Sequence, residues 1–128
     1  MSMEVTEEKL ELNSRFFRIN LLQLDNAVVA FMFEDRMRMG TVAIAMAGTG
    51  EVAVGRSSVL VGGKYLMTTR ALAERLAAKT GKIALVSLFT ELDEPEALRM
   101  YAKLLEKIPA TSKAEGRGRV NDLVGENA

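Results

Sequence analysis

The sequence predicts an α+β domain, in which an antiparallel or mixed β-sheet carries its helices on one face. Three short blocks are almost free of polar side chains, namely residues 27–33, 42–47 and 83–89. A strand with one solvated face alternates apolar and polar residues, so each block is typical of a strand buried on both faces. Only two segments have the spacing of a good helix, and two helices cover one face of a sheet. The other face therefore needs a partner.

The composition excludes several kinds of chemistry. The 128 residues include 17 basic and 17 acidic side chains, so no overall field draws the chain to nucleic acid or to an anionic membrane. The chain has no cysteine and no histidine, which removes disulfides, thiolate nucleophiles and the commonest general base and metal ligand. No apolar run approaches the ~18 residues of a membrane-spanning helix, and the amino terminus is acidic, unlike a signal peptide. We therefore expect a soluble protein of the cell interior.

The strands can be placed from their alternation and from turn residues. Residues 16–24 alternate between Phe17, Ile19 and Leu21 and more polar neighbours, as expected of an edge strand with one solvated face. The pair Asp25-Asn26 tolerates turn conformations and predicts a hairpin to residues 27–33. A charged connector, residues 34–40, leads to a strand over residues 41–47. A turn at residues 48–50 and short strands over residues 52–54 and 58–61 follow.

Two helices are predicted from their apolar spacing and caps. The first begins near Thr68 or Thr69, either of which is an N-cap candidate, and ends at Gly81. After the strand over residues 83–89, Asp93 begins the second helix with Glu96 three positions later, as in a capping box. Pro109 marks the end of that helix.

These elements divide the chain into three parts. Residues 1–15 are charged and weakly patterned, and we expect a flexible segment. Residues 16–109 hold the main strands and both helices and are enough for one core. Residues 110–128 are rich in glycine and charged side chains and predict a disordered tail.

Two glycine-containing segments imitate phosphate-binding sites. Residues 50–57 have the spacing of a P-loop, but Arg56 occupies the lysine position and a strand follows where a helix should begin. Gly62, Gly63 and Lys64 precede the first helix and could hold an anion there, although a solvated connector explains them as well. We favour the structural explanation for both.

A cluster of carboxylates precedes the second helix, and it comprises Glu91, Asp93, Glu94 and Glu96. Paired carboxylates can transfer protons or hold a hard cation. Negative charge also stabilises a helix N-terminus, which explains these residues without chemistry. We therefore predict no catalytic, cofactor or metal site and no enzymatic activity. A small nucleotide-binding or hydrolytic domain that uses Arg56, Lys64 and this cluster is the competing hypothesis.

Four segments carry a resemblance to a known family. They read RINLLQLDN over residues 18–26, TVAIAM over 41–46, SSVLVG over 57–62 and LAERLAAKTGK over 72–82. In this order and spacing the chain resembles the proteasome assembly chaperone 4 family, across residues 16–109. The connector over residues 34–40 and the long tail depart from the family pattern.

The resemblance implies a chaperone without enzymatic activity or cofactor. Members of the family pair through their sheets with a related subunit, or with themselves in the related chaperone 3, and promote assembly of the α-subunit ring of the 20S proteasome. The implied partners are a sister chaperone or a second copy, together with proteasome α-subunits, in the cytoplasm or nucleus. Neither nucleic acid nor membrane is an expected partner. An alternative class is a roadblock-like or longin-like dimeric scaffold that serves a GTPase or membrane traffic.

The partner surface can be assigned to particular residues. Small side chains let a helix approach closely, so we place the alanines of residues 41–47 under the helices. The predicted interface then consists of five residues: Val42, Ile44, Met46, Val28 and Met32. Two loops are predicted to contact the proteasome, through Arg36, Met37 and Arg38 in one and Gly62, Gly63 and Lys64 in the other.

Overall fold

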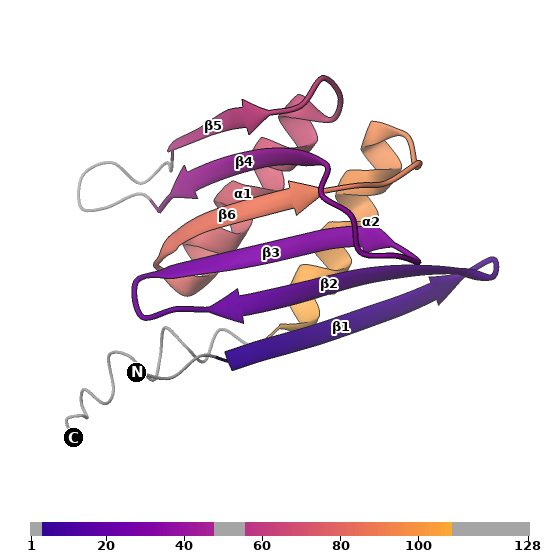
Figure 1. Cartoon of the computed structure of the whole chain (residues 1–128), viewed down its shortest axis with the longest axis horizontal. Coiled ribbons are helices and arrows are strands. Elements are labelled where there is room, and N and C mark those ends of the chain that lie inside the picture. The colour runs from indigo at the N-terminus through magenta and orange to yellow at the C-terminus, as the bar shows by residue number, and fades with distance from the viewer. Residues whose placement is uncertain (1–3, 48–55, 109–128) are drawn as a thin grey trace.

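The structure is a computed structural model that describes residues 4–47 and 56–108, and it contains one six-stranded sheet and two helices (Figure 1). The elements in chain order are β1 (Glu4–Leu12), β2 (Arg15–Gln23), β3 (Ala27–Glu34), β4 (Thr41–Met46), β5 (Arg56–Val61), α1 (Leu66–Thr80), β6 (Ile83–Leu88) and α2 (Glu94–Lys107).

The sheet is mixed, and its strands lie in the order β1-β2-β3-β6-β4-β5. Strands β1 to β3 form an antiparallel meander, and β4 and β5 form an antiparallel pair. Strand β6 lies between them, parallel to β3 and antiparallel to β4. The predicted α+β class and mixed sheet are confirmed.

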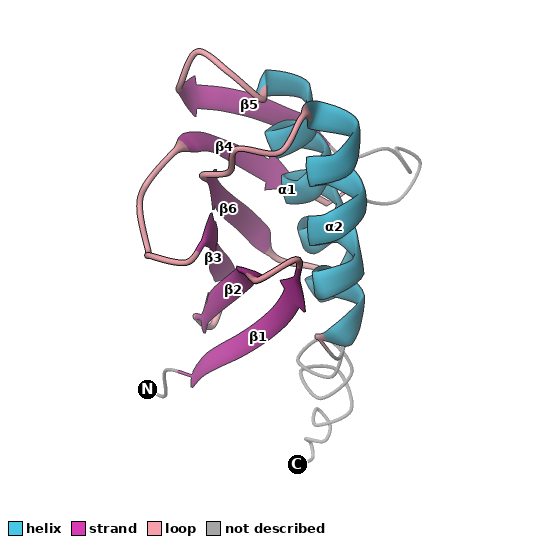
Figure 2. Ribbon diagram, turned by 90° about the vertical axis from the view of Figure 1, so that its right-hand side faces the viewer, coloured by secondary structure: helices cyan, strands magenta, loops and turns pink. Residues whose placement is uncertain are grey.

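Both helices lie against the same face of the sheet (Figure 2). Helix α1 contacts β4, β5 and β6, whereas α2 contacts β1 and β2. The core fills the space between the helices and the sheet. Its largest fully buried side chains include Tyr101, Phe17, Ile19, Met32 and Leu72. The rings of Phe17 and Tyr101 meet edge to face, with their centroids 6.2 Å apart.

Small side chains let α1 lie close to the middle of the sheet. Ala43 and Ala45 of β4 are buried in one cluster with Ala73 and Ala77 of α1. Across the ladder, Ala45 is paired with Ala84 of β6. The prediction that the alanines of β4 lie under a helix is confirmed.

The amino-terminal prediction is wrong for most of its length. Residues Glu4–Leu12 form β1, which pairs with β2 over its whole length, and β1 rather than β2 is the edge of the sheet. On the helix side of β1, only Leu10 contacts the core cluster as an apolar residue, and its neighbours there are Thr6 and Glu8. The strand is held by its backbone ladder more than by burial, so its sequence lacks the apolar alternation of a packed strand.

Helix α1 begins three to four residues earlier than predicted. Its N-cap is Tyr65, whose backbone is left-handed with a φ of 58°, and not Thr68 or Thr69. The Thr69 hydroxyl instead donates to the Tyr65 carbonyl oxygen at 2.6 Å, within the first turn of the helix. The predicted end at Gly81 is confirmed, because its φ of 70° is one that glycine adopts without strain.

Helix α2 begins as predicted. The Asp93 carboxylate accepts a hydrogen bond from the backbone N–H of Glu96 at 3.0 Å. The capping explanation for Asp93 is therefore confirmed. The turn over residues 48–50, the strand over residues 52–54 and the tail over residues 110–128 lie outside the described residues. Neither helix of the described chain has the length and apolar character needed to cross a membrane.

Enlarging Ala43 tests the close contact between α1 and β4. We expect Ala43→Leu to lower the free energy of unfolding by about 1–3 kcal/mol, because the added methyl groups must push α1 away from β4. The conservative change Met46→Leu, on the same strand but at an exposed position, should change it by less than about 0.5 kcal/mol. Urea unfolding at one protein concentration, followed by circular dichroism, measures both. Equal effects of the two substitutions would contradict the assignment of the faces.

Candidate functional site: the open face and the loop end

The face of the sheet that the helices leave uncovered, here called the open face, is largely apolar. Paired residues form rows across the strands, and one row spans all six strands with a single polar member: Val5, Leu22, Val29, Leu85, Ile44 and Ser58. The next row mixes apolar and polar residues: Glu7, Asn20, Phe31, Ser87, Val42 and Val61. The three strands that the sequence predicts to be buried on both faces thus have apolar side chains on both.

Many side chains on the open face are accessible to solvent. Val61, Met46 and Ile83 are 64%, 57% and 39% exposed, while Phe31 and Leu85 are partly buried by their neighbours. The residues on the helix side of β3, β4 and β6 are almost completely buried. Contiguous apolar surface of this kind is typical of an interaction site.

The structure separates the five predicted interface residues into two groups. Val42, Ile44 and Met46 lie on the open face, on the side opposite Ala43 and Ala45.

Val28 and Met32 do not belong to that surface, so this part of the prediction is wrong. Both are fully buried on the helix side, where they pair with Ala84 and Leu88 of β6. The open-face positions of β3 are the alternate residues Val29, Phe31 and Phe33. Strand β3 is apolar on both faces, so its own sequence does not distinguish them.

Two polar atoms on the open face are enclosed. Within the described part of the chain, the Arg18 Nε and the Asn20 Oδ1 are inaccessible to solvent and have no hydrogen-bonding partner. The Arg18 guanidinium lies over the Phe16 ring, 5.5 Å from its centroid, and Arg18 Nη1 is 3.6 Å from a Glu7 carboxylate oxygen. An unsatisfied buried polar atom costs about 1–3 kcal/mol.

Three connections meet at one end of the sheet, here called the loop end (Figure 1): residues 35–40, 62–65 and 89–93. Hydrogen bonds join them. The Thr41 hydroxyl donates to the Lys64 carbonyl oxygen, the Tyr65 hydroxyl donates to the Leu92 carbonyl oxygen at 2.6 Å, and the Thr68 hydroxyl donates to Glu94 at 2.7 Å. The loop end is therefore held together by contacts between segments that are distant in sequence.

Two glycines allow the close approach of these segments. A side chain at Gly40 would place its Cβ 2.0 Å from the carbonyl oxygen of Leu88. Gly62 has a φ of +130°, and a Cβ there would meet the Thr41 side chain at 2.6 Å. Neither position accepts a larger residue without a shift of the backbone.

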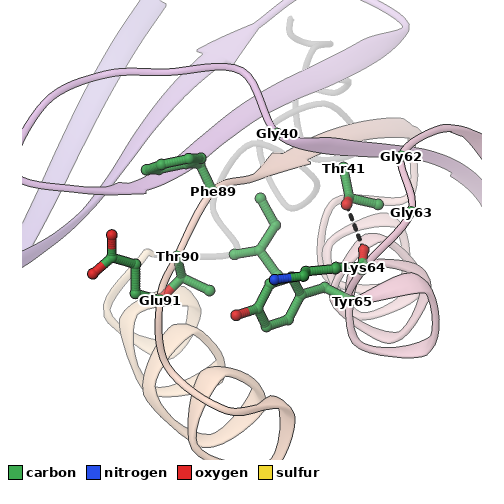
Figure 3. A pocket seen from close by; sticks show the side chains of 10 residues that line it. Gly40, Thr41, Gly62, Gly63, Lys64, Tyr65, Phe89, Thr90 and Glu91 are labelled. Carbon is green, nitrogen blue, oxygen red and sulfur yellow. Dashed lines mark hydrogen bonds between the residues drawn. The ribbon is translucent and has the colours of Figure 1, made fainter.

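The loop end has two neighbouring cavities that share Phe89 and Glu91. The larger one, of about 500 Å³, has Phe89 and Glu91 on one side and Thr41, Lys64 and Tyr65 on the other (Figure 3). Gly62 and Gly63 also line it.

The smaller cavity, of about 270 Å³, lies beside the connector that joins β3 to β4, and Arg36 and Arg38 line it. The Arg38 guanidinium lies 5.0 Å from the centroid of the Phe89 ring. Met37 is exposed on the same connector. The connector bows away from the helices, toward the side of the open face (Figure 2). The two loops predicted to contact the proteasome thus lie beside one another.

A buried carboxylate fixes the position of the loop end. Glu34 accepts hydrogen bonds from Arg15 at 2.6 Å, from the backbone N–H of Glu91 at 2.8 Å and from the Thr90 hydroxyl. Burial alone raises the pKa of Glu34, but these three hydrogen bonds together outweigh it and hold the pKa below its usual range. The hydrogen bond that Arg15 donates to Glu34 also raises the pKa of the Arg15 guanidinium. These hydrogen bonds to Glu34 join β2, β3 and the connection between β6 and α2.

The other motifs have structural roles where the structure describes them. Arg56 is the first residue of strand β5, so no helix follows it as a P-loop requires. Asp93 caps α2, and Glu94 accepts a hydrogen bond from Thr68. Among residues 4–47 and 56–108, no group of three acidic side chains is placed to hold a metal ion.

Comparison with protein-family models gives no match to this chain, and comparison with curated proteins gives none either.

The Glu34 cluster predicts a pH dependence of stability. Because the folded-state pKa of Glu34 lies below its unfolded value, the stabilising effect is full above that unfolded value and is lost as the pH falls through the folded one. We expect Glu34→Gln to lower the free energy of unfolding by about 1–3 kcal/mol at neutral pH. It should also flatten the loss of stability between about pH 5 and pH 3.

Glu91→Gln is the matched control, because the Glu91 side chain is exposed and only its backbone N–H contacts Glu34. Urea unfolding at several pH values measures both variants. A Glu34→Gln profile parallel to that of the unmodified chain would refute the stabilising role of the ionised carboxylate.

Proposed function

We propose that this chain is a non-enzymatic chaperone that works as a dimer, with itself or with a related subunit, and binds proteasome α-subunits to promote assembly of the 20S core. The open face is the observation that carries the proposal. The resemblance over residues 16–109 names the kind of partner, because members of that family associate through their sheets.

The energetics of the open face support a dimer. Burial of a large apolar side chain stabilises by about 1.5–3 kcal/mol, shared between folding and association when a partner supplies the cover. Ile44, Leu85, Val29 and Leu22 lie in one row across four adjacent strands, so a second sheet could cover them together. Packed sheets lie about 10 Å apart, with interdigitated side chains.

The loop end is the proposed surface for α-subunits. Its segments are joined by hydrogen bonds, so little conformational freedom is lost when a partner binds. It has three cationic side chains, Arg36, Arg38 and Lys64, and two exposed methionines, Met37 and Met39. Flexible, polarisable methionine side chains adapt to irregular partner surfaces.

A charge placed on the open face tests the dimer. We expect Ile44→Asp to shift the chain or its complex to a smaller species, because a carboxylate would be buried against an apolar sheet. Met67→Asp is the matched control, since Met67 is an exposed apolar residue of α1 and lies off the open face. Gel filtration with light scattering, with and without a candidate sister subunit, measures the mass. An unchanged dimer of normal stability in the Ile44→Asp variant would refute this interface.

Co-expression with individual proteasome α-subunits tests the assignment of the client. We expect one or more of them to be retained on the tagged chain, and the double change Arg36→Glu with Lys64→Glu to weaken that retention severalfold through charge reversal. Lys103→Glu, at an exposed position of α2, should leave retention unchanged.

Two other results would overturn the proposal. Retention of a small GTPase in place of an α-subunit would favour the roadblock-like or longin-like scaffold. Saturable nucleotide binding that is lost in Arg56→Ala and Lys64→Ala would favour an enzyme.

A further inference from the structure

The two edges of the sheet differ in how well they resist pairing with another strand. Within the described residues, β1 is paired only with β2 and β5 only with β4, so each has an outer row of backbone N–H and C=O groups free to pair. Proteins commonly protect such an edge with charged side chains. The β1 edge has charged residues along its length, among them Glu7, Glu8, Lys9 and Glu11. The β5 edge has one, Arg56, at its first residue.

Strand β5 also exposes apolar side chains at its far end. The pairing of β5 with β4 skips Leu60, so β5 contains an extra residue at an irregularity of the ladder. Leu60 and Val61 are 55% and 64% exposed. An edge with a single charge at one end and exposed apolar side chains at the other is one to which a further strand readily adds.

Helix α1 holds β5 in place from the inner side. The Ser57 hydroxyl donates to the Glu74 carboxylate and accepts a hydrogen bond from the Arg70 Nε at 3.0 Å. The strand is therefore fixed to the domain on its helix side, and a strand that adds to it meets a preformed edge.

The charge pattern of β5 is compatible with pairing to itself. A two-fold axis perpendicular to the sheet keeps each residue on its own face, so two copies of β5 pair antiparallel with Ser58 opposite Ser58. The two Arg56 residues then lie about 13 Å apart along the strand direction, beyond the screening length at physiological salt. The centre of the pair is formed by Ser57, Ser58 and Val59, which have no charge. The same pairing of β1 would bring the two copies of Glu8 together at its centre, which is unfavourable.

We infer that β5 is an association edge for a second copy of this chain, paired antiparallel about a two-fold axis so that the two six-stranded sheets become one continuous sheet. This contact uses backbone groups at the edge, whereas the proposed chaperone dimer uses side chains of the open face. The inference does not depend on the proposed function, and both contacts can exist in one assembly.

Amide hydrogen exchange measures the pairing of β5 with a second strand directly. Outward-facing amides of residues 56–61 exchange rapidly in a single chain and become protected when a second strand pairs with them. We expect their protection, measured on the full chain by mass spectrometry, to increase with protein concentration in step with the mass from sedimentation velocity. Exchange in β1 should not change in parallel. The inference would be overturned if the β5 amides exchanged at the same rate at every protein concentration. It would also be overturned if sedimentation velocity showed only a monomer at every concentration.

Charge substitutions at Ser58 supply the matched test. Ser58 is exposed near the middle of β5, so Ser58→Lys places two ammonium groups close together across the axis. We expect the dissociation constant for self-association to rise roughly tenfold or more, and an equimolar mixture with Ser58→Glu to restore it. Met67→Lys, at an exposed apolar position of α1 that lies off both the open face and β5, is the control and should leave association unchanged. Equal weakening by Met67→Lys, or no rescue in the mixture, would refute pairing through β5.

The open-face substitution separates this contact from the proposed dimer. We expect Ile44→Asp to keep the concentration-dependent protection of β5 even where the open-face dimer is lost. If Ile44→Asp abolishes all association and β5 exchange never depends on concentration, association occurs through the open face and the edge inference fails. Protection of β5 that appears only when an α-subunit is added would likewise overturn its assignment to a second copy.

Discussion

The close contact between α1 and the alanines at the middle of the sheet determines the arrangement of both faces. Ala43, Ala45 and Ala84 give α1 a shallow surface, and α1 meets it with Ala73 and Ala77. Because side chains alternate along a strand, this contact places Val42, Ile44 and Met46 on the other face. With α2 beside α1 on the same side, no helix of the described chain remains to cover them. The small residues on one side of β4 thus determine which side of that strand belongs to the open face.

The local pattern of apolar and polar residues predicts most of the fold, but it does not predict which side of every strand faces the helices. In β4 the alternation of small and large residues identifies the helix side, and the structure agrees. In β3 both faces are apolar, and the side of Val28 and Met32 is decided by the pairing with β6, which sequence spacing does not reveal. Sequence spacing does not reveal the start of α1 for a related reason, since Tyr65 has a left-handed backbone and its hydroxyl donates to the carbonyl oxygen of Leu92, far along the chain.

The loop end was predictable only in fragments. The two loops could be singled out separately by their charges and glycines, but their proximity depends on the position of β6 between β3 and β4. Glu34 gave no local signal, because its partners Arg15, Thr90 and the Glu91 amide come from two other segments. A buried carboxylate with three donors can be found by tracing hydrogen bonds in three dimensions, whereas the sequence shows only one acid in a charged connector.

Strand β6 is the last strand in the chain, yet it lies in the interior of the sheet. Ala27 pairs with Ile83, 56 residues later, and contacts of such separation form slowly because much chain entropy is lost before they stabilise anything. During synthesis, β3 and β4 leave the ribosome before β6, and each then has an inner edge without its final neighbour. The half-made sheet is the state most open to wrong pairing, and any strand that reached this gap first would compete with β6 for its place.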